Sequence, residues 1–194
     1  PLKSISDNPH VSILHIAFTK HAPNIALKPF VESIFKRKVM RTEYDPHVPI
    51  PESVIARLKD MQTEPGITLH LVTDPIRRLG IAEFQAQADG YVINSKKFSK
   101  ELGEWLLPNN TTSYVGMPGT GFGLQDDQAL RLHEGLLGNR PLEPEDGLRF
   151  SLAGKLGIEK SPVIGFLTAD KDDIPHWILT GRTLERILLL CASN

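Results

Sequence analysis

The strongest candidate for chemistry is a short basic segment, FKRKVMR, at residues 35–41. Arginine carries a planar fork of donors that matches phosphate oxygens, whereas lysine carries a compact point charge. Arg37 and Arg41 stand four positions apart, so both would share one face if a helix continued through them. Basic residues at a helix C-terminus also complement the helix dipole without any ligand. The segment therefore indicates either a phosphate site or a solvated helix end, and its composition by itself favours the second interpretation.

The second candidate is a glycine-rich segment, GMPGTGFG, at residues 116–123. Its glycines allow the backbone to approach a ligand closely and to present N–H groups to it. The spacing matches neither the GxxxxGK[ST] phosphate loop nor the GxGxxG turn of dinucleotide-binding folds. A mobile loop is the simpler interpretation, and a lid over a binding site is the sharper one. In the lid interpretation, Gly119 and Gly121 are the candidate cofactor contacts.

Other familiar site patterns are missing from the sequence. The seven histidines form neither HxxxH nor HExxH, so the sequence predicts no metal site. There is no GxSxG elbow, and the acidic residues at 170–173 suit helix capping better than paired-carboxylate catalysis. The single cysteine, Cys191, excludes an intrachain disulfide and is expected to be a buried small hydrophobe in an apolar helix. We predict no catalytic side chain.

The overall composition is that of an ordinary globular domain. The 194 residues carry 22 basic and 23 acidic side chains, which leave a formal charge of −1. Nucleic-acid binders usually gather a basic surplus on one face, so this balance argues against that class. No apolar run reaches the roughly 18 to 20 residues of a membrane span, and the first residues lack the order of a signal peptide. We therefore expect a cytoplasmic protein that contacts neither nucleic acid nor membrane.

The elements that must position the two segments alternate between helix and strand. Apolar periodicity, N-cap residues and proline or glycine breaks define each expected element. This alternation predicts an α/β or α+β layer fold. The expected strands are 11–18, 67–73 and 161–168, and the expected helices are 30–35, 51–61, 74–107 with an interruption near 90–97, 126–137 and 176–193, with loops at 108–123 and 138–147.

Three stretches together resemble the nitroreductase superfamily, and specifically its atypical Acg-type branch. IFKRKVMRTEYD at 34–45 is similar to that branch's segment of helix-ending arginines followed by an aromatic residue. The stretch at 49–73 is a proline-led helix and a strand that ends in LHLVT. The stretch at 161–192 gives a strand, an acidic turn and a helix of the form DWLxxGxxLERxLLxA. The resemblance implies an α+β sandwich whose central, mostly antiparallel sheet is flanked by helices.

The resemblance also implies a flavin site in the basic segment. In the family, the first arginine contacts the FMN phosphate or ribityl chain, and the last basic residue approaches the ring. Carried over, these positions are Arg37 and Arg41, with Lys38 at the second basic position. Val39 occupies the third position, where the family has serine or threonine, so that contact could come only from the backbone.

The chain resembles one copy of a two-copy arrangement. Nitroreductases bind FMN between two copies of the fold, and Acg-type proteins place both copies in one longer chain. The stretch that opens the first copy and the strand that closes the fold have no counterpart here. We therefore expect residues 1–194 to be an incomplete nitroreductase-like domain with a variable loop or lid at about 108–150. Its partner would be the second copy, in the same chain or in a homodimer.

Three functions follow from the resemblance. The first is an NADH- or NADPH-dependent FMN oxidoreductase that reduces nitro compounds, quinones or similar small acceptors. The second is a protein that binds or sequesters FMN without turnover, because the loop at 115–123 closes over the ring. The third is a half that binds no flavin and only packs against its partner copy, an interpretation to which Val39 gives weight.

Overall fold

The computed structural model describes residues 17–37, 39, 41, 43–45 and 47–193. The chain divides into two compact units, and the boundary between them passes through two strands. Unit 1 contains the described residues up to Arg37, the segment Gln62–Thr68 and residues 167–193. Unit 2 contains the described residues of 38–61 together with Leu69–Phe166.

Unit 1 is built on two helices, α1 and α7, which pack against each other. Glu64 connects the segment Gln62–Thr68 to α7. Its Oε1 lies 3.3 Å from Arg182 Nη2 and 3.0 Å from Arg186 Nη1. Its backbone N–H also donates to Thr183 Oγ1 at 3.4 Å. The elements are η2 (Ile25–Leu27), α1 (Lys28–Lys36) and α7 (Ile174–Ala192).

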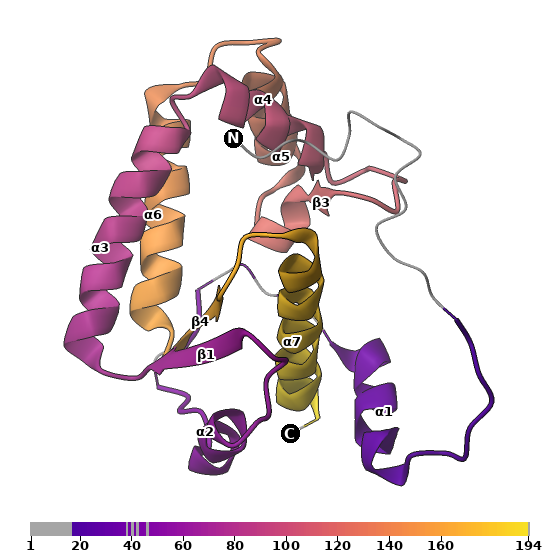
Figure 1. Ribbon diagram of the computed structural model, residues 1–194. Coiled ribbons are helices and arrows are strands. Elements are labelled where there is room, and N and C mark those ends of the chain that lie inside the picture. Colours follow the sequence, from indigo (N-terminus) through magenta and orange to yellow (C-terminus); the bar gives the residue numbers. More distant parts are fainter. Residues whose placement is uncertain (1–16, 38, 40, 42, 46, 194) are drawn as a thin grey trace. The chain divides into compact units, whose positions relative to one another are not determined.

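Unit 2 contains two helix pairs, and the two helices of each pair lie side by side (Figure 1). The pairs are α3 with α6 and α4 with α5. A small core forms where the pairs meet, from Ile93, Leu106 and Leu136, each at most 5% exposed. The elements are α2 (Glu52–Lys59), α3 (Pro75–Val92), α4 (Lys96–Trp105), β2 (Leu106–Leu107), β3 (Met117–Pro118), η3 (Gly119–Phe122), α5 (Asp126–Leu137) and α6 (Pro144–Lys160).

The described strands form two sheets of two strands each. β1 (Ile67–Val72) pairs with β4 (Ile164–Ala169), and both strands cross the boundary between the units. β2 pairs with β3 in parallel, with Leu106 opposite Met117. The α+β prediction is confirmed at the level of mixed helix and strand, but the described residues contain no single central sheet.

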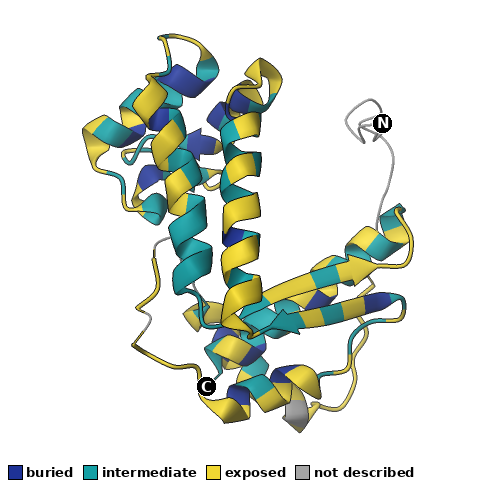
Figure 2. Ribbon diagram, turned by 90° about the vertical axis from the view of Figure 1, so that its left-hand side faces the viewer, coloured by how far each residue is buried: buried dark blue, intermediate teal, exposed yellow. Residues whose placement is uncertain are grey.

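Polar side chains hold the α3–α6 pair together. Arg78 donates from its guanidinium to the Ser161 carbonyl, and Lys155 pairs with Glu83. Ser151 Oγ donates to the carbonyl oxygen of Ala86 at 2.7 Å. Figure 2 shows that most of both helices is exposed or only half-buried. The pair therefore depends on specific polar contacts more than on a thick apolar layer.

Local signals in the sequence placed most element boundaries correctly. The helix expected from residue 74 is α3, and Asp74 caps it, since its carboxylate accepts from the Arg77 N–H at 2.8 Å. Asp173 caps α7 in the same way, so the capping interpretation of the acidic turn is confirmed. α1, β1, α5, β4 and α7 all lie within a few residues of their predicted ranges. The predicted strand at 11–18 falls almost wholly outside the described residues, and residues 17 and 18 are not in a strand.

Four predictions need correction. The predicted loop at 108–123 contains β3 and η3. The predicted loop at 138–147 ends early, because the helix α6 begins at Pro144 and continues to Lys160, where no helix was predicted. In the helix expected at 176–193, helical spacing would place Trp177, Gly181, Leu184, Ile187, Leu188 and Cys191 on one apolar stripe. The structure instead buries Thr183 and Leu190, because α7 turns its Thr183 side toward Glu64, and it exposes Trp177, Gly181, Leu184 and Cys191. Cys191 is therefore not the buried residue that its apolar neighbours predicted.

Candidate functional site

The basic segment begins where α1 ends. Pro29 stands in the first turn of α1, where its missing N–H costs nothing, and the helix stops at Lys36. Arg37 caps the helix with ψ near 129°, and its N–H donates to the Ser33 carbonyl at 2.8 Å. The chain then leaves the helical path, so Arg37 and Arg41 do not share one helical face as the four-residue spacing had allowed.

Arg37 is engaged within unit 1. Its Nε lies 3.3 Å from Glu185 Oε1 on α7, and both side chains are partly exposed. An exposed pair of this kind contributes only about 0.2–1 kcal/mol. The contact therefore occupies the Arg37 guanidinium without fixing it strongly, and the positive charge is partly balanced by a carboxylate.

Arg41 is held differently, within unit 2. Its guanidinium carbon lies 5.3 Å from the centre of the Phe122 ring, within the range of a cation–π contact. Phe122 ends η3 and packs on the unit 2 core of Ile93, Leu106 and Leu136. The ring is therefore anchored by the core and carries a cation, so Arg41 and the glycine-rich segment meet although they are about 80 residues apart in sequence.

Asn109 fixes the glycine-rich turn. Its Oδ1 accepts from the Thr120 N–H at 2.6 Å, and its Nδ2 donates to the Leu124 carbonyl at 3.0 Å and to Asp126 Oδ1 at 2.9 Å. The turn also closes on itself, because the N–H of Leu124 donates to the Gly119 carbonyl at 3.1 Å. One side chain thus connects both ends of the turn, which makes it an ordered element.

The two candidate glycines have different surroundings. Gly119 is buried, and a Cβ added there would overlap Ala129 Cβ and lie 2.9 Å from Asn109 Oδ1. At Gly121 an added Cβ would meet no atom within 4 Å. Gly119 is therefore required for packing of the turn on α5, whereas the backbone of Gly121 is open to an approaching molecule.

The remaining predicted site residues are less informative. Val39 is 50% exposed. Lys38 lies outside the described residues. The structure thus brings together Arg41 and the turn that contains Gly119 and Gly121, while Arg37 belongs to the other unit.

Two residues of this site were not singled out from sequence. Phe122 lies within the glycine-rich segment. An aromatic residue among glycines was the sequence signal that could have marked it as a site residue. Asn109 carried no usable signal, because its hydrogen-bond partners lie 11 to 17 positions further along the chain. Only the folded chain shows what these two side chains do.

Other ionisable groups outside this site are explained by local structure. His176 Nδ1 lies 2.5 Å from Asp173 Oδ1, and this hydrogen bond is the main reason that the pKa of Asp173 is lowered. Burial raises the pKa of the Cys191 thiol, although part of the residue reaches the surface. The described residues contain no cluster of histidine, cysteine or acidic side chains that could hold a metal ion. None of the described helices has the length and apolar character that a bilayer span requires.

This chain matches no protein-family model, no curated protein and no solved structure. The geometry of Arg41, Phe122 and the clamped turn is therefore the basis for assigning a function.

Proposed function

We propose that this chain binds FMN and is one half of a nitroreductase-type oxidoreductase. The observation that carries the proposal is the contact of the Arg41 guanidinium with the Phe122 ring at the glycine turn. The nitroreductase resemblance and the glycine-rich composition had marked these two segments separately. Their meeting gives one place with a cation, an aromatic face and an open backbone position at Gly121.

These groups fit a flavin. FMN combines a planar aromatic ring with a phosphate dianion, and Phe122 and Arg41 offer an apolar surface and a positive charge. Bound FMN would supply the hydride and electron chemistry, with NADH or NADPH as donor and a nitro compound, quinone or similar small molecule as acceptor. Arg41 would favour negative charge on the ring edge. No catalytic acid or base is assigned.

The exposed apolar surface supports a second copy as partner. On one side of η2 and α1, each of four apolar residues is at least 50% exposed: Leu27, Val31, Ile34 and Phe35. On α3, Ile76, Phe84 and Tyr91 are at least 73% exposed. Surfaces of this kind usually mark an interface. We propose that a second copy covers them, and that β1 and β4 belong to a nitroreductase-like sheet that the second copy helps to enclose.

The decisive experiment is flavin binding by the full-length protein. The protein is reconstituted with FMN, desalted and examined for the visible absorption of flavin, and NADPH is then added without oxygen. Retained flavin that bleaches supports the oxidoreductase. Retained flavin that NADPH cannot bleach supports the alternative, FMN sequestration without turnover. Absence of retained flavin would overturn both.

The site assignment is tested with one pair of variants. Arg41→Ala should weaken FMN binding by about tenfold or more, because a charge-assisted contact is removed. Arg77→Ala is the matched control, since Arg77 is an exposed arginine in the first turn of α3. Equal losses in the two variants would show that general charge, and not this site, attracts the phosphate.

A further inference from the structure

A concave site lies in unit 2, at the opposite end of α5 from the glycine turn. It is an open cleft of about 480 Å³ between the start of α4 and the end of α5. Its apolar floor includes Ile93, Leu136 and Leu142, which belong to or pack against the core. The volume falls within the roughly 300–1,000 Å³ of small-molecule sites, which are likewise mostly apolar with few polar groups.

The charge of this cleft is of one sign. Its cationic side chains are Lys96 and Lys100 on α4 and Arg140 in the connection after α5. Among the described residues that line it, none is acidic. Within the described part of the chain, neither lysine forms an ion pair, so two ammonium groups stand on one wall without a carboxylate partner.

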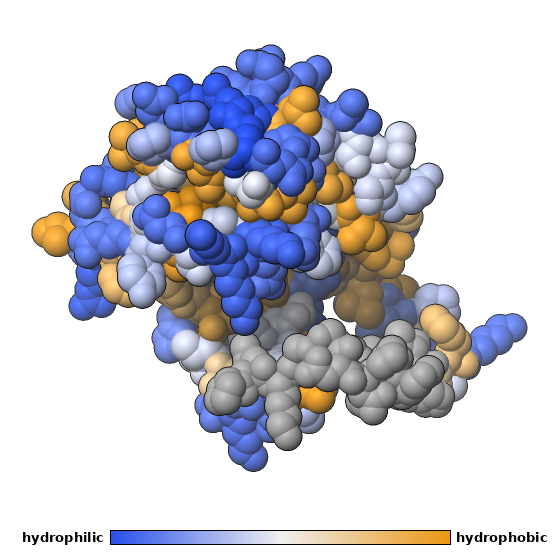
Figure 3. All heavy atoms as spheres, turned by 90° about the horizontal axis from the view of Figure 1, so that it is seen from above, coloured by the Kyte–Doolittle hydropathy of each residue, from blue (hydrophilic) through white to orange (hydrophobic). Residues whose placement is uncertain are grey.

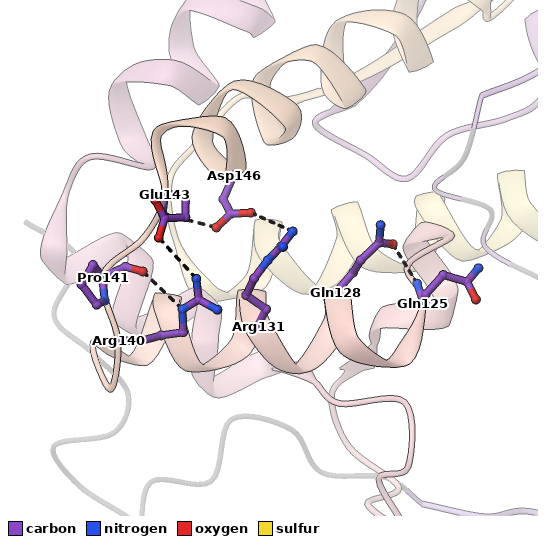
Figure 4. A network of polar contacts seen from close by, with 7 residues as sticks. All are labelled: Gln125, Gln128, Arg131, Arg140, Pro141, Glu143 and Asp146. Atoms are coloured by element: carbon purple, nitrogen blue, oxygen red, sulfur yellow. Dashed lines mark hydrogen bonds and ion pairs between the residues drawn. The ribbon is translucent and has the colours of Figure 1, made fainter.

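Arg140 faces the same cleft from the other wall and is only weakly engaged. Its Nε donates to the Pro141 carbonyl at 3.4 Å, and its Nη2 lies 3.7 Å from Glu143 Oε1 (Figure 4). A guanidinium has five N–H donors, so these two long contacts leave capacity for an anion. Figure 4 also shows that the nearby carboxylate of Asp146 forms an ion pair with Arg131.

The start of α4 is electrostatically unfavourable in the isolated chain. Lys96 and Lys97 stand in its first turn, where the positive end of the helix dipole disfavours cations, and Ser95 makes no side-chain cap. α5 and α6 begin in the opposite way, with acidic first turns and capping boxes. A local conflict of this kind is typical of a functional position, and an anion bound beside Lys96 would relieve it.

We propose that this cleft binds a small phosphorylated molecule that carries an apolar or aromatic body. The phosphate lies between Lys96, Lys100 and Arg140, and the body lies against the apolar floor. Figure 3, which views the molecule from above, shows apolar side chains between hydrophilic ones on that face. The site is separate from the flavin site, because Ala129 beneath the glycine turn and Leu137 are about 12 Å apart along α5.

The test uses adenosine 5′-monophosphate as probe, with inorganic phosphate and adenosine as its two parts. Amide NMR spectra of the full chain are recorded during titration with each. The monophosphate should bind more tightly than either part and should shift amides at 93–100 and 135–142. Failure of the monophosphate to bind at millimolar concentration, or shifts elsewhere in the chain, would overturn the proposal.

Paired variants separate this site from general charge. Lys100→Gln combined with Arg140→Gln should weaken binding of the monophosphate by about tenfold or more, because two charge-assisted contacts are lost. Lys97→Gln is the matched control, since Lys97 is an exposed lysine of the same helical turn that does not line the cleft. An equal loss with Lys97→Gln would overturn the assignment. Arg41→Ala should leave monophosphate binding unchanged, so failure here is distinguishable from failure of the flavin site.

Discussion

Arg37 and Arg41 come from one basic segment, yet Arg37 lies against a carboxylate on α7 whereas Arg41 lies against an aromatic ring beside the glycine turn. The carboxylate of Glu185 partly balances the charge of Arg37. Phe122 has no net charge, so it positions Arg41 while leaving its positive charge available to a phosphate or a reduced ring. The difference teaches that a basic cluster is not one site, because the partner of each arginine decides how much charge remains for a ligand.

The largest expected effect concerns the turn that carries Phe122. Gly119→Ala should destabilise the protein by about 1–3 kcal/mol, because the new methyl group would overlap buried Ala129. Gly121→Ala is the control in the same turn and should stay within about 0.5 kcal/mol, since its methyl group meets no atom. Urea unfolding followed by circular dichroism measures both. Equal effects would mean that the turn does not pack on α5 as described.

The next effect concerns the clamp on the same turn. Asn109→Ala removes three hydrogen bonds, including the one from Thr120 N–H, and should cost about 1–3 kcal/mol. Asn110→Ala changes an exposed neighbour and should cost little. If the clamp positions Phe122 for Arg41, Asn109→Ala should also weaken FMN binding. Unchanged binding would separate the clamp from the site.

A smaller effect would sharpen the contrast between the two arginines. Glu185→Gln should lower the free energy of unfolding by about 1 kcal/mol or less, because the exposed pair with Arg37 is lost. Glu101→Gln, at an exposed position on α4, controls for the change in net charge. Urea unfolding followed by circular dichroism measures both. Equal effects in the two variants would mean that Glu185 does not engage Arg37.

The smallest effect concerns the partly buried carboxyl group of Asp89. Burial raises the pKa of Asp89 above its usual value, and the hydrogen bond from Gln85 Nε2 at 2.7 Å opposes this only in part. A raised pKa means that ionisation costs the folded state, so stability falls as pH rises through the folded pKa. Asp89→Asn should therefore be more stable than wild type at neutral pH, and this advantage should disappear below about pH 4.

Thermal unfolding of both proteins across pH measures this difference. A stabilisation that stays constant at every pH would show that Asp89 ionisation is not its cause. Asp127→Asn, at an exposed position in the first turn of α5, is a control that should not be stabilised, because its charge favours the helix start.

Much of the secondary structure was predictable from local signals. Asp74 followed by proline marks the start of α3, and the apolar β-branched run at 67–72 marks β1. The stretch of α6 was missed because it has three glycines and little helical periodicity, and it forms through contacts with α3. The exposed side of α7 was misjudged for a similar reason, since Thr183 is buried by a segment more than 100 residues away.

The sequence by itself determined which segments carry charge, glycine and caps, because these properties belong to single residues and their near neighbours. It therefore indicated the basic segment, the glycine segment and the mixed helix and strand composition. Only the tertiary structure decided that Arg41 meets Phe122 and that Arg37 meets Glu185. It also decided that Asn109 fixes the glycine turn. Such pairings join residues far apart in the chain, and their energy depends on distances that no local pattern contains.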